Sequence, residues 1–274
     1  MSLRHVEKDL NSRGLKGLAK AVAGIRQDFS DRTGEKDIPF PEPMKKSQRA
    51  SEVESQTPNP LDLLRQAAQE LNKNPFNPEA VTNFQQAFWQ VPRGKEGLTF
   101  DIGVCNATEE KLAKPIINVE GKKIPPFTFG VPSELKGKKG LIMLGRMFPE
   151  INSYSVAEDT PIEDESEYTG YLKVEGVIDS PNLNTDEEQV RQHFASQGIS
   201  GQRLITYLIV SRQMKIIKGQ YPDQGSTWSR LFGSRRGGRA VYARCHPGGC
   251  VVVFRFLFPQ DRLAHLGARS EEVL

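Results

Sequence analysis

Five arginines alternate with glycine and aromatic residues in one segment near the C-terminus, 229–244 (SRLFGSRRGGRAVYAR). These arginines are Arg230, Arg235, Arg236, Arg239 and Arg244. A guanidinium group presents a fork of donors that matches a phosphate, and glycine lets backbone N–H groups approach the same anion. Neighbouring rings such as Trp228 and Tyr242 could stack on bases. The segment therefore predicts a phosphate-binding site but does not say whose phosphates. The alternative is a solvated loop, or one that pairs with the acids of 158–167.

The charges of the flanking sequence are unevenly distributed. Residues 191–262 carry twelve Arg and Lys and two acids, whereas residues 150–190 carry twelve Asp and Glu and one cation. A concentrated positive face attracts polyanions over long range. We therefore predict one polyanion-binding surface, built from Arg203, Arg212, Lys215, Lys218, Arg230, Arg235, Arg236, Arg239 and Arg244. The acidic stretch 150–167 offers a complementary surface for head-to-tail association of copies of the chain.

Other residue types that could support chemistry lack partners at a useful spacing. Cys245, His246 and Cys250 surround a Pro-Gly-Gly turn, but the second ligand pair of a zinc site is missing. The simpler interpretation is two small strand residues that flank a hairpin turn. None of the four histidines has the context of a catalytic group. We predict a non-enzymatic protein without catalytic residues, metal or cofactor. A metal-dependent enzyme that acts on nucleic acid, which would need an acid such as Asp101 or Asp179, is an alternative.

The first 57 residues read as a flexible arm. The part 32–57 mixes charges with prolines and has too few apolar residues to offset the entropy of ordering. Within the arm, 13–29 has apolar residues at helical spacing, with lysine and arginine on the other side. These apolar residues are Leu15, Leu18, Val22, Ile25 and Phe29. Two interpretations are open: a helix that meets a membrane or a partner, or a short helix packed on its own domain.

The remaining chain, 58–274, is predicted to form one α+β domain. Proline after asparagine marks helix starts at Pro60 and Pro78, and further helices are predicted at about 186–196 and 200–217. Strands are predicted at 98–104, 114–121, 125–131, 140–148, 168–178, 240–244 and 250–258, with a loop at 219–239. No regular strand–helix alternation occurs, so we expect a mainly antiparallel sheet with packed helices, not a doubly wound parallel sheet.

A mixed-charge arm followed by an α+β body with a basic face resembles, in layout only, small structural proteins of viruses, of the matrix and the coat or nucleocapsid kinds. The resemblance rests on the arm RTGEKDIPFPEPMKKSQRASEVESQT and on the segment SRLFGSRRGGR, and no family site is carried over. It implies an assembly protein that binds RNA or an anionic lipid surface, itself and other structural proteins. A regulatory nucleic-acid-binding protein is the alternative. Three cysteines and the lack of a signal-like apolar segment predict an intracellular protein, peripheral at a membrane or in a virion.

Overall fold

The computed structural model describes residues 58–274 except 154–161, 165, 250 and 255–257. The predicted arm helix, with Leu15, Leu18, Val22, Ile25 and Phe29, lies outside the described residues. The helices are α3 (Pro60–Lys73), α4 (Pro78–Gln90), α5 (Glu109–Ala113), α6 (Gly137–Met147), α7 (Glu187–Gln197) and α8 (Leu204–Lys218), with a 3-10 turn η1 (Pro149–Ser153). None of the described helices is long and apolar enough to cross a membrane.

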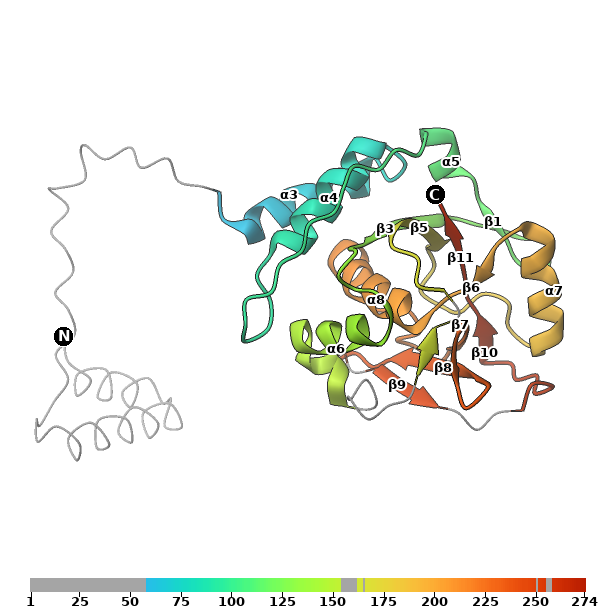
Figure 1. The fold of residues 1–274 in the computed structure, drawn as a ribbon. Helices are drawn as coiled ribbons and strands as arrows, with labels where there is room; N and C mark the ends of the chain where they lie inside the picture. Colours follow the sequence, from blue (N-terminus) through green and yellow to red (C-terminus); the bar gives the residue numbers. More distant parts are fainter. Residues whose placement is uncertain (1–57, 154–161, 165, 250, 255–257) are drawn as a thin grey trace, which may run out of the picture. The chain divides into compact units, whose positions relative to one another are not determined.

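The strands form two larger sheets and one short ribbon (Figure 1). They are β1 (Ile116–Ile117), β2 (Lys123–Ile124), β3 (Pro126–Val131), β4 (Glu163–Asp164), β5 (Gly170–Glu175), β6 (Ser200–Gly201), β7 (Trp228–Arg236), β8 (Arg239–Cys245), β9 (Val251–Phe254), β10 (Leu266–Ala268) and β11 (Ser270–Val273). One sheet has the order β10-β7-β8-β9 with β4 also on β7, and the other has the order β3-β5-β11-β6. The predicted α+β class with mainly antiparallel pairing is confirmed. The expectation of a single sheet is wrong, because the strands divide between two sheets, and β10 pairs with β7 in parallel.

Helix α8 lies at the centre of the domain, where it contacts β3 in one sheet and both β7 and β8 in the other (Figure 1). All residues from Leu204 to Met214 are buried, so this part of the helix has no solvent-facing side. A helix buried on all sides belongs to the core. The prediction that Arg212 belongs to a polyanion-binding surface is therefore wrong, because Arg212 lies inside the protein.

Helices α3 and α4 pack side by side as the predicted hairpin (Figure 1). The Asn59 side chain accepts the N–H of Leu61 at 3.0 Å, and the Asn77 side chain accepts the N–H of Ala80 at 2.9 Å. These bonds satisfy backbone donors that a helix start leaves free. The aromatic rings of α4, Phe84, Phe88 and Trp89, are fully buried and belong to the core.

Two predicted strands have other structures. Residues 98–104 form no strand. The backbone groups of Phe100 bind α4 instead of a neighbouring strand: the Gln90 amide donates to Phe100 O, and Phe100 N donates to Trp89 O. Residues 140–148 lie mostly in α6. A short apolar run does not distinguish a strand from a buried helix by periodicity alone.

Candidate polyanion-binding site

The arginine-rich segment is a β-hairpin, not the loop that the sequence predicts. Strands β7 and β8 pair in antiparallel fashion, with Arg236 opposite Arg239 at the tip. The two-residue turn is Gly237 and Gly238, whose φ angles are 57° and 76°. Glycine adopts this left-handed region without steric cost, and two successive positive φ angles match the tight turns preferred in hairpins. The turn thus holds the two tip arginines on opposite strands at one end of the hairpin.

Strand β7 carries an irregularity that joins it to the start of α8. The register between β7 and β8 shifts between Leu231 and Arg235. Within this bulge, the Ser234 hydroxyl accepts the N–H of Leu204 at 2.7 Å. A Cβ on Gly233 would lie 2.4 Å from the carbonyl oxygen of Gly201, so only glycine allows this close approach. The bulge fixes the hairpin against the central helix.

Three of the nine predicted surface cations are in the interior. Arg203 is 2% exposed, Arg212 is 4% exposed and Arg230 is 0% exposed. Their inclusion in one exposed cationic surface is therefore wrong. A buried charge requires hydrogen bonds or an opposite charge to offset lost hydration. Arg203 and Arg212 have both, and Arg230 has hydrogen bonds to backbone carbonyls.

Arg203 and Glu271 form an ion pair at the beginning of α8. The Arg203 Nε atom lies 2.6 Å from Glu271 Oε1, and its Nη1 atom donates to the carbonyl oxygens of Ser166 and Tyr168 at 2.9 and 3.0 Å. Glu271 also accepts the Thr206 hydroxyl at 2.6 Å. The charge of Arg203 is thus neutralised within the fold.

Arg212 makes a similar set of internal contacts. Its Nη1 atom lies 2.8 Å from Glu150 Oε1, and its Nη2 atom donates to Gly249 O at 2.6 Å. Its guanidinium carbon lies 4.7 Å from the Tyr221 ring centroid. The charge of Arg212 is used to join α8 to η1 and to the β8–β9 turn.

Arg230 and Arg235 lie on β7 with internal partners. The Arg230 guanidinium donates to the carbonyl oxygens of Thr185, at 2.6 Å, and of Asp261. Arg235 is half-buried, and its Nη1 atom lies 3.1 Å from Glu187 Oε1 on α7. Part of the acidic stretch 150–190 is therefore folded against part of the basic one.

The two predicted lysines bind the backbone at the far end of α8. Lys215 donates to Gly219 O at 2.8 Å, and Lys218 donates to Gly176 O. Cations are favourable at the C-terminus of a helix, where carbonyl groups lack partners. These lysines support the helix end and lie on a different element from the hairpin arginines.

Arg236, Arg239 and Arg244 remain as the candidate site. Arg239 is exposed, and Arg236 and Arg244 are half-buried. Within the described part of the chain, none of the three has a carboxylate partner. The buried Nε atoms of Arg236 and Arg244 have no hydrogen-bond partner. These three guanidinium groups keep their charge available at the hairpin.

Two of these arginines lie over aromatic rings. The guanidinium carbon of Arg244 is 5.1 Å from the Trp228 ring centroid, and that of Arg239 is 6.0 Å from the Phe258 ring centroid. Phe258 is 56% exposed, although phenylalanine is among the residue types most often fully buried. We call Arg236, Arg239, Arg244, Trp228 and Phe258 together the hairpin surface.

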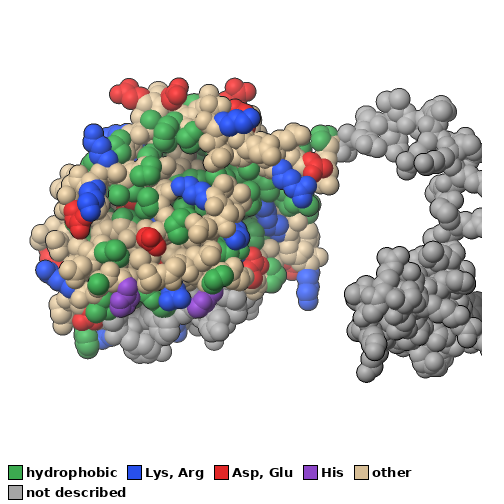
Figure 2. All heavy atoms as spheres, turned by 180° about the vertical axis from the view of Figure 1, so that it is seen from behind, with side chains coloured by type: hydrophobic (Ala, Val, Ile, Leu, Met, Phe, Trp, Pro, Cys, Tyr) green, Lys and Arg blue, Asp and Glu red, His purple; other side chains and the backbone are tan. Residues whose placement is uncertain are grey.

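On one face of the protein the charges are mixed. On the face shown in Figure 2, the Lys and Arg side chains are dispersed among acidic and hydrophobic side chains and form no continuous cationic patch. A dispersed pattern of both signs is typical of an ordinary soluble surface. The described residues on this face therefore do not form the expected single large basic surface.

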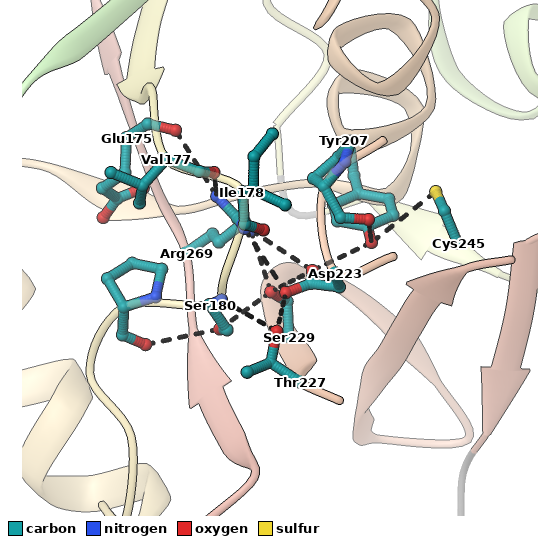
Figure 3. Close-up of polar contacts among 12 residues, drawn as sticks. Glu175, Val177, Ile178, Ser180, Tyr207, Asp223, Thr227, Ser229, Cys245 and Arg269 are labelled. Carbon is teal, nitrogen blue, oxygen red and sulfur yellow. Dashed lines mark hydrogen bonds and ion pairs between the residues drawn. The ribbon is translucent and has the colours of Figure 1, made fainter. Parts of the chain in front are cut away.

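A buried charge cluster lies between the two sheets, around Asp223 and Arg269 (Figure 3). Asp223 accepts hydrogen bonds from the hydroxyls of Tyr207, Thr227 and Ser229 at 2.9, 2.8 and 2.7 Å. The Arg269 Nη2 atom lies 3.3 Å from Asp223 Oδ1, and both residues are at most 2% exposed. A catalytic role would need access to a substrate, so the burial of this cluster indicates a structural role.

Burial also keeps the neighbouring groups of the cluster neutral. Burial, and next the Asp223 carboxylate, raise the pKa of Tyr207 well above its ordinary value. Burial raises the pKa of the Cys245 thiol to about 11. Without a bound metal the thiol is therefore protonated near neutral pH, whereas a reactive cysteine is a thiolate. His246 is half-buried at the start of the turn, and Cys250 lies outside the described residues.

The alternative of a metal-dependent enzyme has no assembled site in the described part of the chain. No three His, Cys, Asp or Glu side chains gather there in a way that could hold a metal ion. Asp101 is exposed and accepts the Gln90 amide at 2.6 Å. A cleft of about 470 Å³ beside α5 is lined by residues that include Asn106, Lys111 and Tyr168, and no carboxylate, histidine or cysteine side chain is in its lining.

Sequence reasoning missed strand β7, Phe258 and Arg269. The strand could have been found, because two glycines between β-rich segments are a strong hairpin indicator. Phe258 and Arg269 carry no such indicator: the proximity of Phe258 to Arg239 and of Arg269 to Asp223 depends on tertiary packing.

Comparisons of the chain with protein-family models, curated proteins and solved structures found no match. The layout resemblance to viral structural proteins therefore stays a prediction.

Proposed function

We propose that this protein is a non-enzymatic nucleic-acid-binding protein that contacts phosphates through the hairpin surface. The observation that carries the proposal is the set of three guanidinium groups, of Arg236, Arg239 and Arg244, without carboxylate partners in the described residues. Of the other arginines of the same segment, Arg235 pairs with Glu187, and Arg230 is buried and donates to backbone carbonyls. The uncompensated charge is thus concentrated at one hairpin.

Two further features favour a phosphate as the partner. Arginine presents several donors in a fixed plane and binds phosphate oxygens in a bidentate manner. A buried donor without an acceptor costs free energy, and the Nε atoms of Arg236 and Arg244 are in this state. An anion that draws the two guanidinium groups outward would relieve this cost.

An anionic membrane is the rival partner, because lipid head groups also carry phosphate. The exposed aromatic ring of Phe258 fits either partner, since it can stack on a base or enter the lipid interface, and the comparison of RNA with vesicles decides between them. Self-association through the acidic stretch stays a separate prediction. Light scattering at low and high salt would test it.

The proposal is tested by replacing Arg236, Arg239 and Arg244 together with glutamine. The full-length variant and wild type are compared for binding to a labelled 12-nucleotide RNA, to heparin and to vesicles that contain phosphatidylserine. We expect a loss of RNA affinity of about tenfold or more at low salt, because three phosphate contacts are removed. The melting temperature should change little, since none of the three forms an internal ion pair.

The matched control replaces three exposed cations elsewhere, Lys73, Lys95 and Lys114, with glutamine. Both variants lose three positive charges, so only position distinguishes them. The control should retain most of the RNA affinity. Equal losses in both variants would mean that binding follows total charge, and binding to vesicles alone would assign the surface to lipid. Either result would overturn the proposal.

A further inference from the structure

The two arginine–aromatic pairs lie at opposite ends of strand β8. Arg244 stacks with Trp228 at one end, and Arg239 lies over Phe258 at the other. Arg244 lies five positions after Arg239, which corresponds to about 16 Å along a strand. The hairpin register confirms this arrangement, because Ser229 pairs with Ala243 and Arg236 pairs with Arg239. The hairpin surface therefore has two separated contact points.

The part of the hairpin between the two pairs is buried and offers no exposed ring or guanidinium group to a ligand. Arg230 is fully buried, its guanidinium donates to Asp261 O, and its carbon lies 5.7 Å from the Tyr242 ring centroid. Tyr242 is itself only 2% exposed. Because side chains five positions apart leave a strand on opposite faces, a ligand that uses both contact points must be an extended chain that bends around the hairpin, and a small molecule would reach only one of them.

We propose that the hairpin surface selects single-stranded over double-stranded nucleic acid, with bases stacked on the Trp228–Arg244 and Phe258–Arg239 pairs. This inference rests on the proposed function. Bases in a duplex are already stacked within the helix and present only their edges. An unpaired base has a free face that can stack on an aromatic ring or a guanidinium plane. At roughly 3.4 Å per nucleotide of stacked strand, at least about five nucleotides are needed to cover the distance of about 16 Å along the strand.

Stacking is tolerant of sequence, because every base has a π-face. No described side chain of the hairpin surface other than arginine provides a fixed hydrogen-bonding pattern for base edges. The inferred site therefore binds single strands with little sequence preference. The phosphates contribute most of the affinity, and the rings determine the preference for unpaired strands.

The experiment compares a 12-nucleotide oligouridylate with a 12-base-pair RNA duplex, using the full chain and fluorescence anisotropy. Trp228→Leu and Phe258→Leu remove the rings but keep apolar side chains. We expect each change to weaken binding to the single strand by roughly five- to hundredfold and to leave binding to the duplex unchanged. Tyr168→Leu, at a half-buried tyrosine in the cleft beside α5, is the matched control and should bind like wild type.

Tryptophan fluorescence gives a second readout. The chain has two tryptophans, Trp89 and Trp228, and Trp89 is 0% exposed. Oligouridylate should quench the emission of Trp228, and the Trp228→Leu variant should lose this quenching. The emission of Trp89 without RNA does not depend on binding, so its shift also identifies a variant that fails to fold.

The outcomes separate the inference from the proposed function. The inference alone would be overturned if both RNAs bound with equal affinity and the ring variants had no effect, while the Arg236, Arg239 and Arg244 variant still bound more weakly. Absence of binding to either RNA would overturn both. A preference for the single strand that the ring variants abolish would support both.

Discussion

Arg269 lies in the interior with all its donor atoms engaged. Besides Asp223, it contacts the Ser229 hydroxyl at 2.9 Å and the carbonyl oxygens of Val177 and Ile178 at 3.1 and 2.8 Å. Desolvation lowers the pKa of Arg269, but Asp223 and the other partners outweigh it, so the net shift is upward. A buried charge is stable only under this kind of full pairing.

Replacing Arg269 with methionine should therefore destabilise the protein by about 3–5 kcal/mol, because Asp223 would stay buried without a cation. Chemical unfolding in urea measures the change. Arg262→Met is the matched control: Arg262 is exposed and pairs with Asp186 at the surface, so its loss should cost less than about 1 kcal/mol. If the two variants had the same midpoint, the cluster would contribute no special stability.

Sequence gives the number of charges, but not which of them are buried. Arg230 and Arg239 occur in the same glycine-rich segment, yet Arg230 is 0% exposed and Arg239 is exposed. The difference comes from Thr185 and Asp261, which are distant in sequence and supply acceptors for Arg230. Helix caps such as Asn59 and Asn77 were predictable, because their partners are two or three residues away.

At the scale of elements, local patterns were reliable where they were long or carried a turn residue. The α3–α4 hairpin and strands β3 and β5 were predicted near their actual bounds. Strands β10 and β11 were not predicted, because they have three and four residues and their sequences, LGA and SEEV, lack strand character. Each is stabilised by pairing with a remote strand, β7 and β5, so tertiary context determines their structure.

The β7–β8 turn permits a prediction at this scale. Gly237→Ala and Gly238→Ala should each destabilise the protein by about 1–2 kcal/mol, because both positions have positive φ, which a Cβ disfavours. Gly248→Ala in the neighbouring β8–β9 turn is the control, because its added Cβ would meet no atom within 4 Å and its φ lies outside the disfavoured range. Thermal unfolding distinguishes them: an equal loss at all three positions would show that the hairpin tip does not need glycine.

At the scale of the whole molecule, the fold converts a large sequence asymmetry into a small site. Acids of the stretch 150–190 neutralise cations of the stretch 191–262 inside the domain, as Glu150 does for Arg212 and Glu187 for Arg235. The net charge of +3 is therefore a better guide to long-range attraction than the local excess of arginine. The protein should bind polyanions weakly and with a modest dependence on salt.

The salt dependence of RNA binding measures how many cations take part. Each neutralised phosphate contributes about 0.7 to the slope of log K against log salt for a single strand, so three arginines give a slope of about −2 and nine cations would give about −6. Titrations of oligouridylate at several salt concentrations should yield the smaller value, and the Arg236, Arg239 and Arg244 variant should bring the slope near zero. A slope near −6 that survives in this variant would mean that further cations bind RNA, and that the internal ion pairs described above open when the polymer arrives.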